Sequence, residues 1–182
     1  DSAHPVYTHL ADWCTRLSPN HHASLTDSVT NLPGGDILFL ISCSSIVVQN
    51  TRSRYRHSLV VHASDLPAGR GWSPLVWQIL EGRSSIAVSL LEADDPVDSG
   101  NIWEKRWIHL EGHELYDEIN AALFKAELGL MDFAIQNCDV IQPMPQDHSR
   151  ASWYPRRRPE DSRLDPNRSL ADQFDLLRTA DP

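Results

Sequence analysis

Two titratable side chains stand at the ends of apolar runs, where they could exchange protons with a bound molecule. His62 follows the apolar run Leu59–Val61 and precedes a loop rich in proline and glycine. Asp98 lies in a carboxylate-rich loop after the apolar run Ile86–Leu91. Ligands of open α/β sheets bind at the carboxyl ends of strands, so we expect both side chains on neighbouring loops of one site. A histidine beside an aspartate suits proton transfer during acyl transfer.

The apolar runs and helical spacings predict the elements that must hold these residues. Continuous apolar runs are typical of strands buried in a parallel sheet, which places strands at Asp36–Ser42, Ser58–His62, Ser84–Glu92 and Asn101–Leu110. Apolar residues at helical spacing predict helices at His4–Leu17, Leu75–Gly82 and Gly112–Asn137. Alternating strands and helices indicate an α/β fold with a mainly parallel, Rossmann-like sheet. We expect the first three strands to share that sheet, with the helix after Pro74 packed on it.

The composition changes at residue 142. Five prolines between positions 143 and 166 exclude regular structure over most of this stretch. The segment from Ser169 to about Arg178 is typical of a capped helix. We therefore expect a sheet domain over residues 1–141 and an irregular, partly helical arm over residues 142–182 that lies across it.

Bulk composition excludes several classes of protein. A net charge of −9 over 182 residues disfavours nucleic acid as a partner. Three distant cysteines without a CxxC pair disfavour a disulfide framework, and we expect a cytoplasmic protein. The longest apolar run falls far short of the ~20 residues of a membrane span, so no membrane partner is expected. His109 and His113 are spaced like zinc ligands, but Gly112 interrupts the pair and HExxH is absent, so we predict no metal.

Two motifs carry a resemblance to a known family. The first is His-x-Ser-x-Leu-Pro at the end of a strand, formed by His62, Ser64 and Leu66–Pro67 and followed by a glycine-rich turn, Pro74 and a helix. The second is Asp-x-Gly, here Asp98-Ser99-Gly100. In order and spacing they resemble the folate-dependent formyltransferases, which include methionyl-tRNA formyltransferase, glycinamide ribonucleotide transformylase and the sugar N-formyltransferases. Residues 153–162 look like the C-terminal region of the sugar enzymes.

The resemblance implies an activity and a set of site residues. The expected enzyme moves a formyl group from N10-formyltetrahydrofolate, its co-substrate, to the amine of a nucleotide-linked amino sugar. His62 and Asp98 would be catalytic. The folate would contact two loops, through Ile41, Ser42, Cys43, Ser44, Asp94 and Asp95, and the acceptor would contact Ser64, Arg70, Gly71 and Tyr154.

The chain departs from the family pattern at Val60 and at both ends. The family has an asparagine two residues before the histidine, which helps to hold the developing oxyanion, and here that residue is Val60. Ser58, Ser42, Ser44 or a backbone N–H are the alternatives for that role. The resemblance also implies that the first strand of the domain is missing and that the arm is truncated.

Two other functions stay open beside the amino-sugar enzyme. One is the same reaction on methionyl-tRNA, which the acidic charge disfavours. The other is a degenerate module that binds folate or a sugar nucleotide without catalysis; Val60 favours it, and retention of His62 and Asp98 opposes it. A homodimer also stays open.

Overall fold

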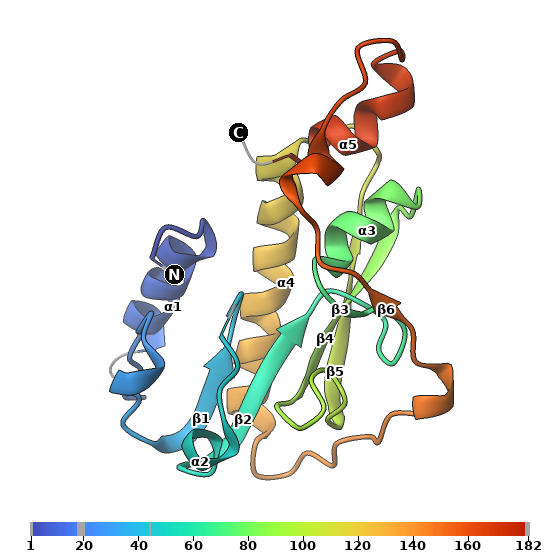
Figure 1. Ribbon diagram of the computed structural model, residues 1–182. Coiled ribbons are helices and arrows are strands. Elements are labelled where there is room, and N and C mark those ends of the chain that lie inside the picture. The colour runs from blue at the N-terminus through green and yellow to red at the C-terminus, as the bar shows by residue number, and fades with distance from the viewer. Residues whose placement is uncertain (1, 18–20, 44, 181–182) are drawn as a thin grey trace.

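The computed structural model describes residues 2–17, 21–43 and 45–180. They form a sheet domain crossed by a C-terminal arm (Figure 1). Its helices are α1 (Val6–Leu17), α2 (Gln49–Arg52), α3 (Pro74–Leu80), α4 (Tyr116–Asn137) and α5 (Phe174–Arg178). Its strands are β1 (Gly35–Leu40), β2 (Tyr55–His62), β3 (Arg70–Gly71), β4 (Ser85–Glu92), β5 (Ile102–His109) and β6 (Trp153–Tyr154). The predicted α/β class is confirmed, as are the four long strands and the three main helices.

The larger sheet has the strand order β1-β2-β4-β5, so the three strands predicted to share one sheet do share it. β1 pairs with β2 in parallel, whereas β2–β4 and β4–β5 are antiparallel. The sheet is thus mixed and has less parallel pairing than the apolar runs predicted. For β4–β5 the reason is the connection over residues 93–101, because a parallel crossover needs a dozen or more residues.

The main core lies between the sheet and α4, which runs along one face of it (Figure 1). Side chains of β2 and β4, such as Leu59 and Val88, pack there with Leu130 of α4 and Ile79 of α3. This confirms that the helix after Pro74 packs on the sheet. A second cluster joins α1 to the other side of α4. Among the described residues no helix has the length and apolar character required to cross a membrane.

A carboxyl group is buried in the middle of α4. Glu127 is 4% exposed, and its Oε2 has no hydrogen-bond partner among the described residues. Its neighbours along the helix, Phe124 and Met131, belong to the cluster with α1, and Leu130 belongs to the main core. Burial raises the pKa of Glu127 to about 8, so the folded protein holds this group as the neutral acid at neutral pH.

The arm is attached to the sheet domain through short backbone pairings. β6 pairs in parallel with β3, and Met144 forms an isolated bridge with Ile102 at the start of β5. The predicted helix from Ser169 to Arg178 is present as a 3₁₀ turn, Ala171–Gln173, followed by α5. The arm therefore does cross the sheet domain, as its composition led us to expect.

Candidate active site

His62 and Asp98 meet at the end of β2, as their positions predicted. His62 Nδ1 lies 3.7 Å from Asp98 Oδ1, within ion-pair reach but beyond a hydrogen bond. Both residues are buried, at 8% and 8% exposure. The 63–72 loop folds back over this strand end, because the carbonyl of Gly69 lies against the His62 ring.

The second ring nitrogen of His62 defines the tautomer. Nε2 lies 2.8 Å from the carbonyl oxygen of Gly69. A carbonyl only accepts, so Nε2 carries the hydrogen and donates it. In the neutral ring the lone pair of Nδ1 then points toward Asp98. The arrangement presents one basic nitrogen on the side of the ring where the carboxylate stands.

The Asp98 loop has an unusual backbone. Asp98 has φ +60°, in the left-handed region that non-glycine residues seldom adopt. Its Oδ2 accepts a hydrogen bond of 2.9 Å from the backbone N–H of Gly71. Gln146 of the arm donates from Nε2 to the carbonyls of Asp98 and Gly100, at 2.9 and 2.7 Å. Two hydrogen bonds therefore fix Asp98: one to its carboxylate oxygen and one to its backbone carbonyl.

Two glycines allow the loops to come this close. At Gly71 a Cβ would lie 2.5 Å from the carbonyl oxygen of Tyr154, and φ is +98°. At Gly100 a Cβ would collide with the carbonyl oxygen of Glu92. Neither contact can be relieved by a side-chain rotation, since both partners are backbone atoms, so a larger residue would displace a loop of the site.

Three of the four residues expected to bind the acceptor lie on the 63–72 loop, and the fourth, Tyr154, lies on the arm strand β6 that pairs with it. Ser64 and Arg70 are buried, at 1% and 4% exposure, and contact with a substrate stays a prediction for both. Gly71 is engaged with Asp98. Tyr154 stacks on Trp77 with the rings 6.3 Å apart and donates to Glu81 Oε2 at 2.9 Å. Burial, together with this hydrogen bond, raises the pKa of Tyr154 to about 12, so the phenol keeps its proton.

The residues expected to bind folate lie on two loops, and Arg52, in the short helix that follows the first loop, binds the second. Arg52, at the end of α2, donates to the carbonyl of Ala93 at 2.7 Å and pairs with Asp95. Asp94 is exposed and accepts from the N–H of Asp95. On the other loop, Ile41 packs in the α1 cluster, Ser42 and Cys43 are exposed, and Ser44 lies outside the described residues.

Val60 occupies an apolar environment. It packs with Leu66, Leu91 and Ile102 on the same face of the sheet as His62. Ser58 does not substitute for the family asparagine, since its hydroxyl donates to the carbonyl of Arg52 at 3.2 Å. It also stands four residues from His62 along an extended strand, about 13 Å away. Ser42, Ser44 and backbone N–H groups stay as predictions for that role.

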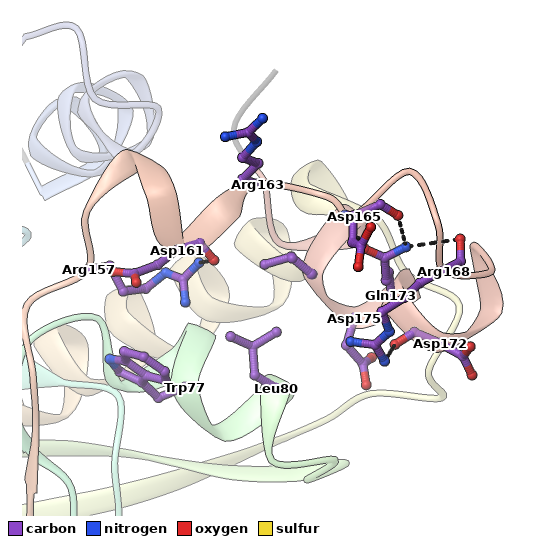
Figure 2. Close-up of a pocket in the computed structure, with 11 residues that line it drawn as sticks. Trp77, Leu80, Arg157, Asp161, Arg163, Asp165, Arg168, Asp172, Gln173 and Asp175 are labelled. Atoms are coloured by element: carbon purple, nitrogen blue, oxygen red, sulfur yellow. Dashed lines mark hydrogen bonds between the residues drawn. The ribbon is translucent and has the colours of Figure 1, made fainter.

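A cavity of about 440 Å³ lies between α3 and the arm, apart from His62 and Asp98 (Figure 2). Trp77 and Leu80 form one side, and arginine and aspartate side chains of the arm form the other. The guanidinium of Arg157 stands over the Trp77 ring at 5.1 Å. Tyr154 connects the cavity to the site, because its ring stacks on Trp77 and abuts Gly69.

Sequence reasoning missed Arg52 and Gln146. Arg52 ends a four-residue helix, which is too short to show a periodic pattern. Gln146 stands in the proline-rich arm, where nothing in the local composition indicates burial. Within the described ranges, no three His, Cys, Asp or Glu side chains gather in a metal-binding arrangement.

The chain matches no family model, but it is similar in sequence to curated proteins. It is 26% identical over 160 residues to the methionyl-tRNA formyltransferase of Streptococcus gordonii. That match covers 86% of this chain and 50% of the relative, so the chain spans about half the length of the curated protein. A methionyl-tRNA formyltransferase of Streptococcus pneumoniae is 29% identical over 126 residues, 67% of this chain and 40% of that protein.

Solved structures share the fold at low sequence identity. Methionyl-tRNA formyltransferase from Clostridium thermocellum superposes with a TM-score of 0.80 at 21% identity, covering 97% of this chain and 79% of that one. An N-formyltransferase from Helicobacter canadensis, in complex with folinic acid and dTDP-3-aminofucose, superposes with a TM-score of 0.66 at 16% identity. That match covers 88% of this chain and 61% of the other. The shared feature of these proteins is formyl transfer, on different acceptors.

Proposed function

We propose that this chain transfers a formyl group from N10-formyltetrahydrofolate to the amine of a nucleotide-linked amino sugar. The premise is its similarity in sequence and fold to the folate-dependent formyltransferases. The observation that carries the proposal is the pair of His62 and Asp98, 3.7 Å apart at a strand end within this fold. The folate supplies the activated formyl group, and the chain's own residues position the amine and move its proton.

His62 is the proton acceptor in this proposal. When the amine attacks the formyl carbon, a C–N bond forms, the carbonyl π electrons move to oxygen, and the nitrogen becomes cationic. The proton passes to Nδ1 of His62, the nitrogen that does not donate to Gly69. Asp98 then stabilises the imidazolium from 3.7 Å. General acid–base assistance of this kind contributes about 10²–10⁴ in rate. Collapse of the tetrahedral intermediate releases tetrahydrofolate, whose departing nitrogen takes back the proton.

Exposed apolar side chains on the two loops suit the flat ring systems of the co-substrate. Ile46 and Val48 follow the first loop at 73% and 61% exposure, and Val97 on the second is 47% exposed. Exposed apolar side chains on neighbouring loops fit the ring faces of a folate. Backbone groups of residues 41–43 would read the pterin edge. Val97 directly precedes Asp98, so a folate held there would bring its formyl group to the catalytic pair.

The cavity between α3 and the arm supports an acceptor with a nucleotide. The guanidiniums of Arg157, Arg163 and Arg168, which stand among aspartates in its lining, are donors that suit the phosphates of a nucleotide. Tyr154 links this cavity to the loop that holds His62. A small free amine would leave the cavity unused.

Methionyl-tRNA is the second candidate acceptor, because the curated relatives reported above are methionyl-tRNA formyltransferases. The net charge of −9 counts against a polyanionic acceptor. The test incubates the chain with N10-formyltetrahydrofolate and, separately, with a panel of nucleotide-linked amino sugars or with methionyl-tRNA, and detects the gain of a formyl group by mass spectrometry. Formylation of a sugar nucleotide supports the proposal, and formylation of methionyl-tRNA alone replaces it. Calorimetric binding of 5-formyltetrahydrofolate with no transfer in any arm would favour the non-catalytic module.

A further inference from the structure

Gln146 joins the two loops that position the catalytic pair. It belongs to the arm, far from His62 and Asp98 in sequence, and is 7% exposed. Its Nε2 donates to the carbonyls of Asp98 and Gly100, and its Oε1 accepts from Arg70 at 2.6 Å. A guanidinium only donates and a carbonyl only accepts, so these partners define which end of the amide is which.

The donor end of Gln146 acts on a strained turn. Asp98, with φ +60°, holds a conformation that costs of order 1–3 kcal/mol in a non-glycine residue and persists only where the surroundings impose it. The loop's own hydrogen bonds run from the N–H and the hydroxyl of Ser99 to the carbonyl of Pro96, and so close a turn that contains Asp98. Gln146 holds this turn from outside the loop, because its one amide group binds the carbonyls of both Asp98 and Gly100. The direction of the Asp98 carboxylate follows from that turn.

The acceptor end of Gln146 acts on the loop that contacts His62. Arg70 is 4% exposed, and in the described part of the chain no carboxylate lies within ion-pair reach of it; its polar partners are Gln146 and His148. Its neighbours along the chain are the two residues that touch the pair: the Gly69 carbonyl accepts from His62, and the Gly71 N–H donates to Asp98. One amide therefore spans both loops.

We infer that Gln146 is a positioning residue for the formyl transfer proposed above, and that it acts through Asp98. The inference rests on that proposed function. A displacement of about 1 Å in catalytic geometry can cost about 10²-fold in rate. Loss of the Gln146 donors should therefore lower kcat while binding of both substrates changes little.

The test substitution is Gln146→Glu, which keeps an oxygen for Arg70 and removes both donors. We expect kcat to fall by roughly 10- to 100-fold, with each KM changing less than about 3-fold. The matched control is Asn137→Asp, which also exchanges an amide for a carboxylate. Asn137 lies at the end of α4, outside the cavity and the His62–Asp98 site, and its amide donates to the carbonyl of Phe133 at 2.8 Å within the same helix. The control should retain kcat within about 2-fold even where its melting temperature falls, because local distortion is not shared by distant sites.

A double-mutant cycle separates positioning from general loss of structure. In an Asp98→Asn background, Gln146→Glu should lower kcat by less than about 3-fold, because groups that act as a unit are not additive. Additive losses, or a Gln146→Glu enzyme with the kcat of the parent, would overturn the inference. If Gln146→Glu does not fold, judged by circular dichroism, Gln146→Met serves under the same criteria, since it keeps the volume without a donor.

A spectroscopic measurement separates the inference from the proposed function. The ring ¹⁵N resonances of His62 are compared, at one fixed pH, in the parent, Gln146→Glu and Asn137→Asp. A change confined to Gln146→Glu supports the positioning role even if the parent formylates no acceptor, in which case only the proposed function fails. Unchanged His62 resonances in Gln146→Glu would overturn the inference whatever the activity.

Discussion

Glu127 predicts how the stability of the fold depends on pH. Its carboxyl is 4% exposed, and burial raises its pKa from 4.5 to about 8. Between these values the unfolded chain has lost the proton and the folded chain retains it. The folded state then binds more protons, so stability falls as pH rises. The stability associated with this group is fully present below about pH 4.5 and is lost as pH rises through about 8.

The size of the effect follows from the two pKa values. At 1.36 kcal/mol for each pKa unit, the cost of burying this carboxyl is about 1 kcal/mol at pH 5, about 3 at pH 7 and nearly 5 at pH 9. The substitution Glu127→Gln removes the titration and adds a cost of its own that does not vary with pH. The prediction therefore concerns the slope of the difference between the two proteins.

The assay is urea unfolding followed by tryptophan fluorescence at pH 5, 7 and 9, with the free energy of unfolding extrapolated to water. The free energy of Glu127→Gln minus that of the parent should rise by about 4 kcal/mol from pH 5 to pH 9. Asp117→Asn, on the exposed side of the same helix, is the control and should show a much smaller change. A difference that stays constant within about 1 kcal/mol would refute the reasoning, since it would mean that the folded protein ionises Glu127 like an exposed carboxyl.

Three further predictions concern the site. His62→Asn and Asp98→Asn should each lower the rate of formyl transfer at least ~10²-fold, and the double variant little further; full activity in either, with the fold checked by thermal melting, would end the catalytic assignment. Val60→Asn should cost about 1–3 kcal/mol in urea unfolding without raising kcat, because it buries an amide among apolar side chains; an active gain with unchanged stability would contradict this. Arg157→Ala should raise KM for the sugar nucleotide by roughly 5-fold at constant kcat, as expected for loss of one guanidinium donor to a phosphate. Arg56→Ala, at an exposed ion pair, is its control, and equal KM values for the two variants would count against the acceptor cavity.

The long elements could be predicted from sequence because each buries a continuous or periodic apolar set. Ile86–Leu91 is an example, since every one of its residues is buried in β4. Pairing direction could not be read from such runs, because burial on both faces does not depend on which way the neighbouring strand points. The two-residue strands β3 and β6 and the four-residue α2 are too short to show any period.

The candidate site could be predicted only in part, for a related reason. His62 and Asp98 follow apolar runs, so a strand-end rule brings them together. The loops around the pair also contact the arm, and the place of the arm is decided by single contacts such as those of Gln146 with Asp98 and of Tyr154 with Gly69. Contacts between segments some 50 to 80 residues apart leave no trace in the local composition of either segment.

The pairing of β3 with β6 has a consequence for how fast the site can exchange its contents with solvent. Arg70 and Trp72 donate their amide hydrogens to the arm, at Ser152 and Tyr154, and only two residue pairs form the ladder. Amides in so short a ladder open at a small fraction of the free energy of global unfolding. This part of the arm should thus separate from β3 and pair with it again many times while the amides of β4 stay protected from exchange. Hydrogen exchange at the amides of Arg70 and Trp72 would report how often the β3–β6 pairing opens. Turnover would then have an upper bound set by the breathing of a surface segment, independent of how well the buried pair performs its chemistry.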